Sequence, residues 1–224
     1  MPSKDESSDE ERRGVYRAIF ERRDVRSHFL PDAVPEEVLC RILRAAHHAP
    51  SVGFMQPWDF LVIRDASIRA AVYRNFECAS RRASEAYRGE QRALYNSLKL
   101  AGILDAPVNV CITCDRERPK GNRLGRQTQP MVDVYSTVCA VQNLWLAARA
   151  ESLGVGWVSI LDPEEVKSTL GIPPALTVVA YLCIGYVSEF RPQPDLEEKG
   201  WETRSPLASV IHFDRWGIHG EDFK

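Results

Sequence analysis

The sequence predicts an α+β protein in which helices flank a mixed central sheet. Apolar residues recur at helical spacing in several segments, and runs rich in β-branched residues separate them. The order is irregular, αα-β-αα-β-α-β-α-β, and differs from strict βαβ repetition. The chain has 224 residues, of which 44% are hydrophobic, and this suits one large core. We therefore expect a single domain over residues 12–224.

The first half of the chain contains four expected helices and one expected strand. Residues 10–22 place valine, isoleucine and aromatic side chains at helical spacing. Residues 35–48 begin with proline and two glutamates and continue with one apolar face, which favours a helix start. WDFLVI (58–63) is typical of a buried strand. Helices are expected over 66–88 and 91–104, the second of them partly exposed.

The second half alternates strands and helices. VNVCITC (108–114) predicts a central strand, because it is almost entirely apolar. Residues 132–152 are apolar nearly all round, so this helix should lie inside the core or between subunits. GVGWVSI (154–160) and residues 176–187 predict strands, and 162–170 predicts a short helix between them.

The tail over residues 188–224 is rich in proline and charge and ends with a PLASVI segment and Trp216. A tail of this length without its own core is expected to pack on another surface. A two-fold homodimer that exchanges these arms would supply one.

Composition argues against several classes of function. The formal net charge of −2 gives no basic face for a nucleic acid. No apolar run reaches the roughly 18 residues of a membrane span. The first residues, 1–11, are polar and charged, lack the apolar centre of a signal peptide, and are expected to form a disordered tail. We therefore expect a cytoplasmic protein.

Six cysteines lie singly within apolar stretches, which is typical of reduced, buried thiols. Cys111 and Cys114 form a CxxC, but residues three apart on a strand point to opposite faces. Two such thiols are poorly placed to bind one ion, and the histidines form no ligand motif. We therefore expect no metal site.

The pentapeptide RRDVR places Arg22, Arg23, Asp24, Val25 and Arg26 at the end of the first expected helix. An arginine there can simply bind the last helix carbonyls. Guanidinium groups also match the oxygens of a phosphate, which makes an anion site the alternative. If the backbone is extended after the helix, Arg22, Asp24 and Arg26 share one side of it.

A second candidate segment is the loop APSVGFMQPW. Pro50 and Ser51 open it, and Met55 and Gln56 precede the next expected strand. Such a loop can place an amide and a hydroxyl against a flat heterocycle, although an ordinary Pro/Gly turn explains it equally well.

The third segment is GVGWVSI. It contains GxG, but it lacks the third glycine of a dinucleotide fingerprint and leads into a strand. Gly156 could let a planar ligand approach the backbone closely. Trp157 and Ser159 are expected on one face of the strand, where the alternative for Ser159 is a satisfied core hydroxyl.

Together these segments resemble the nitroreductase-like flavoproteins. The resemblance rests on RRxxR after the first helix, PSxxxxQPW after the second, a GxGW strand after a long apolar helix, and Arg204 in TRSPL. It covers about residues 12–216. It implies an α+β homodimer with FMN at the subunit interface, the FMN phosphate being held by Arg22, Arg26 and Arg204.

Two departures from the usual nitroreductase pattern indicate one branch. Asp24 stands where serine is usual, and Phe54 stands where asparagine is usual. With these features the chain resembles the 5,6-dimethylbenzimidazole synthases, or flavin destructases, which consume reduced FMN and O₂ to make the lower ligand of vitamin B12. The resemblance implies functional roles for Asp24 and Ser159. The alternative for Asp24 is a partner that only orients the arginines.

The resemblance also implies a lid over the flavin at residues 88–104, with Leu100 near the ring; a surface helix packed on its own core is the alternative. Reduced FMN would then be a substrate supplied by a separate flavin reductase. Two other functions remain open from the sequence, an NAD(P)H-dependent nitro- or quinone reductase and a non-catalytic flavin-binding protein.

Overall fold

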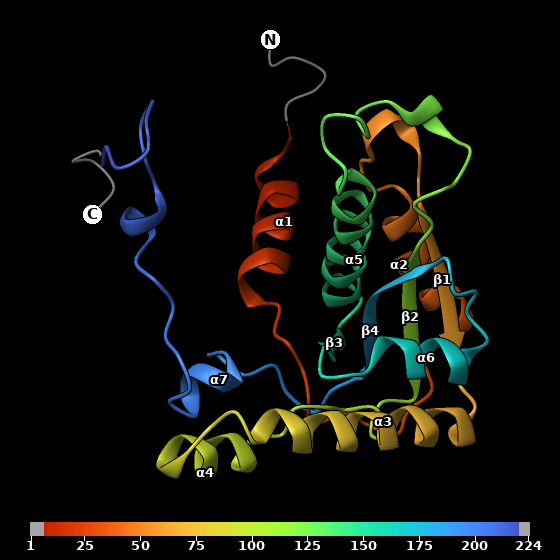
Figure 1. Cartoon of the computed structure of the whole chain (residues 1–224). Coiled ribbons are helices and arrows are strands. Elements are labelled where there is room, and N and C mark those ends of the chain that lie inside the picture. Colours follow the sequence, from red (N-terminus) through yellow and green to blue (C-terminus); the bar gives the residue numbers. More distant parts are fainter. Residues whose placement is uncertain (1–6, 220–224) are drawn as a thin grey trace. The chain divides into compact units, whose positions relative to one another are not determined.

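A computed structural model describes residues 7–219 and confirms the α+β class and the expected order of elements (Figure 1). The helices are α1 (Asp9–Glu21), α2 (Glu36–His47), α3 (Ala66–Ser84), α4 (Gly89–Ser97), α5 (Val132–Ala150), α6 (Pro163–Leu170) and α7 (Asp195–Glu198). The strands are β1 (Trp58–Ile63), β2 (Val108–Cys114), β3 (Leu153–Trp157) and β4 (Thr177–Tyr186). The bounds of β1 and β2 are those that the sequence predicts.

Several expected boundaries were wrong. Helix α1 already begins at Asp9, because Ser8 forms a capping box in which the Glu11 N–H donates to Ser8 Oγ and the Ser8 N–H donates to the Glu11 carboxylate. The expected tail over 1–11 therefore overlaps a helix, and residues 1–6 lie outside the described residues. Helix α4 ends at Ser97 rather than at residue 104, because Leu98 adopts an extended backbone.

The sheet has the strand order β1-β2-β4-β3, with β2 central as expected. Each neighbouring pair in this order is antiparallel, so the expected mixed sheet was wrong. Among the described residues, the isolated bridge between Asp24 and Val155 is the one parallel pairing. Strand β1 is an edge strand with alternating burial rather than a fully buried one.

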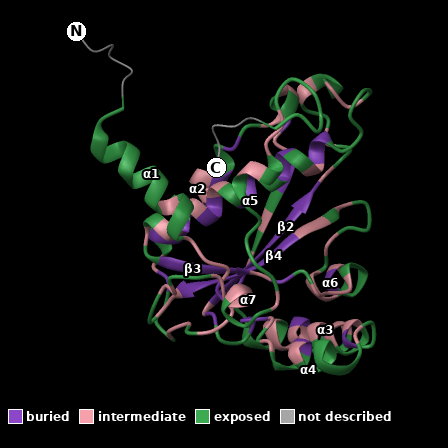
Figure 2. Ribbon diagram, turned by 90° about the vertical axis from the view of Figure 1, so that its left-hand side faces the viewer, coloured by how far each residue is buried: buried purple, intermediate pink, exposed green. Residues whose placement is uncertain are grey.

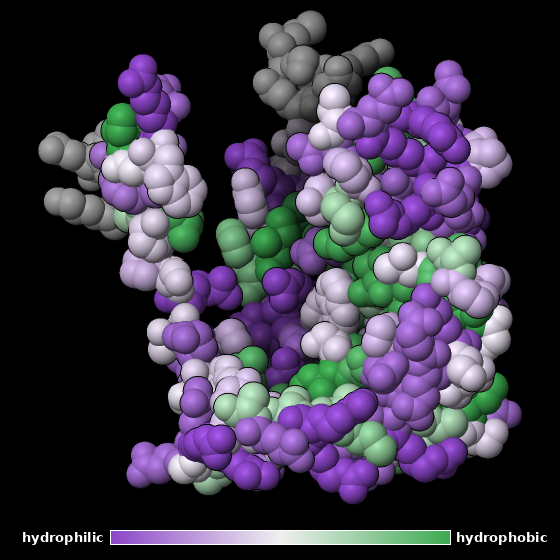
Figure 3. All heavy atoms as spheres, viewed as in Figure 1, coloured by the Kyte–Doolittle hydropathy of each residue, from purple (hydrophilic) through white to green (hydrophobic). Residues whose placement is uncertain are grey.

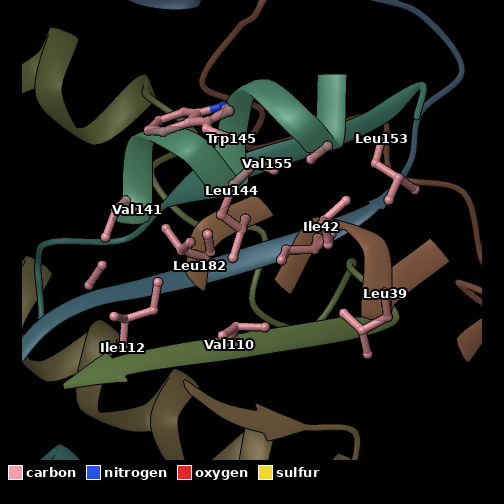
Figure 4. Packing of buried hydrophobic residues seen from close by; sticks show 14 of the residues in the cluster. Leu39, Ile42, Val110, Ile112, Val141, Leu144, Trp145, Leu153, Val155 and Leu182 are labelled. Carbon is pink, nitrogen blue, oxygen red and sulfur yellow. The ribbon is translucent and has the colours of Figure 1, made fainter. Parts of the chain in front are cut away.

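Two hydrophobic clusters cover the two faces of the sheet. Helices α2 and α5 pack on one face against Val110 and Leu182, as Figure 4 shows. Val72 of α3 and Val166 of α6 pack on the other face against Tyr181. Strand β2 is consequently buried throughout, and β4 is buried over residues 180–185 (Figure 2). Helix α5, expected to be buried nearly all round, buries one face along its length, whereas Tyr135 and Val138 on the other face are exposed.

The expectation for the cysteines was only partly right. Cys111, Cys114 and Cys183 are buried, and burial raises the pKa of the Cys111 thiol to about 12. Cys40 and Cys78, by contrast, are exposed on the outer faces of α2 and α3, where the helical period places them.

The chain divides into two compact units, one up to Pro192 and one over Gln193–Lys224. The expected arm began at residue 188, a few residues earlier. Within its described part, the second unit contains α7 and a 3₁₀ turn at Leu207–Val210, and it exposes Leu207, Val210 and Trp216. No helix in the described part of the chain is long and apolar enough to span a bilayer.

Candidate functional site

The segment that contains the three arginines lies against strand β3. The Val25 N–H donates to Val155 O at 2.9 Å, next to the bridge between Asp24 and Val155. A Cβ atom on Gly156 would lie 2.0 Å from Val25 O, so glycine is required for this contact. We expected this glycine to admit a ligand; the structure shows that it admits residues 24–25 of the same chain. The arginine segment and the GVGWVSI segment are thereby joined.

The Asp24 carboxylate accepts a hydrogen bond on each oxygen. Arg26 Nη2 donates to Oδ2 at 2.5 Å, and the Trp157 N–H donates to Oδ1 at 2.9 Å. The Asp24 side chain is 29% exposed and that of Arg26 is 14% exposed, so the pair lies at the edge of the protein surface. These contacts place Asp24 and Arg26 on one side of the backbone, as the extended geometry predicted. They also show that Asp24 does orient an arginine.

Arg22 and Arg23 have different surroundings. Arg23 Nη1 donates to the carbonyls of Phe20 and Arg22, so Arg23 binds the end of α1. The Arg22 guanidinium lies over the Trp145 ring, 5.1 Å from its centroid, and its Nε is buried without a hydrogen-bond partner among the described residues. The helix-capping role that the sequence allowed for Arg22 therefore belongs to Arg23 instead.

Trp145 is a residue of this region that the sequence did not single out. Its Nε1 donates to Arg23 O at 3.2 Å, and its ring lies 6.3 Å from that of Trp157. A tryptophan in an apolar helix such as α5 needs an acceptor for its indole N–H, and this requirement could have pointed to Trp145 from the sequence. Trp145 thereby connects α5, β3 and the arginine segment.

The loop after α2 has an unusual backbone. Gly53, Phe54 and Gln56 have φ angles of 60°, 52° and 46°, and the Gln56 N–H donates to Ser51 Oγ at 3.2 Å. Pro50 is exposed and Ser51 is half-buried. Met55 is fully buried and thus packs inside the protein rather than at its surface. The loop is ordered by specific contacts and is more than an ordinary turn.

The structure does not bring the remaining predicted residues into direct contact with Asp24. Ser159 follows the end of β3 and is exposed, so neither the extended strand to residue 160 nor the core-hydroxyl alternative was right. Leu100 lines a cavity of about 290 Å³ between α3 and α4. Arg204 is exposed in the unit Gln193–Lys224, which is described by itself.

The turn after α4 does reach the arginine segment. A Cβ atom on Gly102 would lie 2.6 Å from the Phe29 ring and 3.3 Å from Arg26 O. Helix α4 itself buries only Tyr95 among its residues, whose hydroxyl hydrogen-bonds with Ser80 of α3. The expected lid region is thus lightly attached at α4 and closely packed at Gly102.

Comparison with known proteins gives the family. The sequence profile of the Nitroreductase family matches residues 19–186. The chain is 44% identical over 194 residues to a 5,6-dimethylbenzimidazole synthase from Rhodospirillum rubrum, covering 86% of this chain and 92% of that protein. It is also 44% identical over 186 residues to a 5,6-dimethylbenzimidazole synthase from Rhodobacter capsulatus, covering 83% and 89% of the two proteins.

Solved structures share the fold. Oxidised iodotyrosine deiodinase, bound to FMN and 3-iodo-L-tyrosine, superposes with a TM-score of 0.72 at 22% identity over 90% of this chain and 100% of that one. A nitroreductase-type protein from Desulfovibrio desulfuricans, in complex with FMN, gives a TM-score of 0.62 at 26% identity over 90% and 97% of the two chains.

Proposed function

The chain belongs to the nitroreductase family, and from this premise we propose that it acts as a 5,6-dimethylbenzimidazole synthase, using O₂ to fragment reduced FMN. The observation that carries the proposal is the 44% identity with a protein of that activity over 92% of its length. The product would serve as the lower ligand of vitamin B12.

The arginine segment fits the phosphate end of FMN. Arg22 has a buried Nε without a partner in the described residues, and Arg26 is mostly buried beside Asp24. A guanidinium fork in such surroundings favours a phosphate oxygen, because a buried donor without an acceptor is costly. Arg22, Arg26 and Arg204 are the residues proposed to hold the phosphate.

The reduced flavin supplies the electrons for oxygen chemistry, and the protein contributes position and proton transfer. Asp24 Oδ1 is held by the Trp157 N–H, which fixes the direction of the carboxylate. Oδ2, which accepts from Arg26, is the oxygen proposed to accept a proton when the ligand phosphate draws Arg26 away. The exposed Ser159 hydroxyl is proposed as the second proton-transfer group.

A homodimer is proposed to complete the site. Helix α1 buries none of its residues, and its apolar side chains are 39–69% exposed at Val15, Tyr16, Ile19 and Phe20. Tyr135 and Val138 of α5 are also exposed, and Figure 3 shows hydrophobic side chains over α1 and α5. An apolar face of this kind is typical of a subunit interface.

The deciding experiment supplies chemically reduced FMN and air to the purified protein and analyses the products by mass spectrometry. We expect 5,6-dimethylbenzimidazole. Intact FMN with hydrogen peroxide alone would contradict the proposal, and steady NADH oxidation with FMN retained would favour a nitro- or quinone reductase instead. Because the substrate is already reduced, a separate flavin reductase is proposed to supply it in the cell.

Two variants test the residue roles. Asp24→Asn and Ser159→Gly should bind FMN normally and make product roughly 10²- to 10⁴-fold more slowly, the range expected when an acid–base group is lost. Asp32→Asn, at an exposed position a few residues further on, is the matched control. Unchanged product rates in both variants would remove Asp24 and Ser159 from the mechanism.

A further inference from the structure

We propose that Arg118 is a positioning residue: it holds the loop 51–56 in the conformation in which that loop contacts the flavin ring. The inference rests on the proposed function, because it takes FMN as the ligand. It concerns the loop between β2 and α5, to which the sequence assigned no role.

Arg118 connects both sides of Pro57. Its Nη1 donates to Gln56 O at 2.8 Å and to Trp58 O at 3.1 Å, and its Nη2 donates to Asp59 Oδ2 at 2.5 Å. In addition, the Asp115 N–H donates to Pro57 O at 2.7 Å. A single guanidinium thus fixes the exit of the loop 51–56 where it enters β1.

The loop needs such an external restraint. Phe54 and Gln56 have left-handed backbones, which residues other than glycine adopt only where the surroundings impose them. The hydrogen bond from the Gln56 N–H to Ser51 Oγ is local and cannot fix the loop relative to the sheet. Arg118 supplies the missing connection, because Trp58 and Asp59 already belong to β1.

The loop between β2 and α5 packs closely against the loop 51–56. A Cβ atom on Gly121 would lie 2.5 Å from Gly53 O, so the two backbones touch at a pair of glycines. Lys120 Nζ hydrogen-bonds Gln56 Oε1 and lies over the Phe54 ring, 4.8 Å from its centroid. The Gln56 side chain is therefore oriented from the same loop that holds its backbone.

Both loops, the one between β2 and α5 and the loop 51–56, are anchored to α5. Arg126 binds Asp133 with contacts of 2.6–3.1 Å, and the two side chains are 13% and 2% exposed. The Val52 N–H donates to Ser136 Oγ at 3.2 Å. The loop 51–56 is thereby held between the N-terminal turn of α5 and the start of β1.

The test separates ring recognition from phosphate recognition. Arg118→Met is titrated with FMN, riboflavin and lumiflavin, and binding is followed by flavin fluorescence. We expect the variant to bind each of the three flavins roughly tenfold more weakly than wild type, because a displaced loop misplaces its contacts with the ring that all three share. The visible absorption bands of bound FMN should shift as well. Arg22→Gln should instead weaken FMN alone, since only FMN has a phosphate.

Two further variants keep the test decisive. Arg118→Lys retains the charge but has fewer hydrogen-bond donors, so its flavin affinity should lie between those of wild type and Arg118→Met. Arg123→Met removes a cation of the same loop that is 77% exposed, with only a 3.8 Å contact to Glu117, and should bind like wild type. Circular dichroism at the titration temperature shows whether each variant is folded.

The inference is overturned if folded Arg118→Met binds FMN with wild-type affinity and spectrum. A loss confined to FMN, with riboflavin unaffected, would overturn it as well. Both measurements use oxidised flavin, so they hold even if wild-type protein makes no benzimidazole; that result would remove the proposed reaction and leave the positioning role standing.

Discussion

Two loops that the sequence singled out are attached to the sheet in different ways. Residues 24–30 are bound through main-chain groups: Val25 N–H to Val155 O at 2.9 Å, and Leu30 N–H to Tyr186 O at 2.8 Å. The loop 51–56 is bound largely through side chains, chiefly Arg118, with Ser136 and the Arg126–Asp133 pair behind it.

The difference predicts which substitutions each loop tolerates. Main-chain bonds survive most side-chain changes and fail only where a new atom enters the space between the two backbones. A loop bound through ionic side chains fails when one partner is removed and the other stays buried. The first loop should therefore be robust and the second fragile.

Arg126→Met should have the largest effect. It leaves the Asp133 carboxylate buried and unpaired, which typically costs about 3–5 kcal/mol of unfolding free energy. Urea denaturation followed by circular dichroism measures this loss. Arg123→Met, in the same loop, should cost almost nothing because Arg123 is exposed. Equal stabilities for the two variants would mean that the second loop does not depend on its buried ion pair.

Gly156→Ala should break the first loop, because its Cβ would lie 2.0 Å from Val25 O. We expect a loss of about 1–3 kcal/mol from overpacking and a marked loss of FMN affinity as residues 24–25 move away. The control is Gly14→Ala on α1, where a Cβ meets nothing within 4 Å and should slightly stabilise the helix. Wild-type FMN binding by Gly156→Ala would refute the main-chain explanation.

Trp145→Phe should have a smaller effect. It removes the hydrogen bond to Arg23 O and weakens the contact under Arg22, and we expect a loss of about 1 kcal/mol. The main-chain bonds to β3 remain, so Asp24 should keep its place. A thermal unfolding curve together with an FMN titration measures both quantities. A collapse of FMN binding would show that the first loop also depends on its side chains.

The smallest effect concerns pH. A hydrogen bond from Arg17, with Arg149 nearby, holds the pKa of the Glu21 carboxyl below its usual range. Because the folded-state pKa is lowered, the stabilisation is present above the ordinary value of about 4.3 and disappears as the pH falls through the folded value. The difference in Tm between wild type and Glu21→Gln should therefore be small at pH 7 and vanish in acid. A difference independent of pH would contradict this.

Local sequence patterns predicted the bounds of two strands. The strands 58–63 and 108–114 were bounded correctly, because apolar runs between turn residues leave few alternatives. The start of α1 is also encoded locally, because Ser8 and Glu11 have the S-x-x-E spacing of a capping box. The partial exposure of β1 was not predictable from its residues. Whether a strand is buried depends on its place in the sheet and on the elements packed against it, and its composition does not give that place.

For the candidate site, the sequence predicted some local geometry but not the contacts between its segments. The side shared by Asp24 and Arg26 follows from the two-residue period of an extended chain. The role of Gly156 could not be predicted, because it depends on a segment more than a hundred positions away in the chain. The same holds for Arg118, whose acceptor Trp58 O is 60 positions earlier.

The hydrogen bond between Asp24 and Trp157 spans 133 positions, and this has a consequence for the timing of synthesis. A ribosome adding about 5–20 residues per second delivers the later residue on the order of ten seconds after the earlier one. During that interval Asp24 Oδ1 lacks the Trp157 N–H, although Arg26, the partner of Oδ2, is only two positions away. The proposed flavin site can therefore take its final geometry only after β3 has been synthesised.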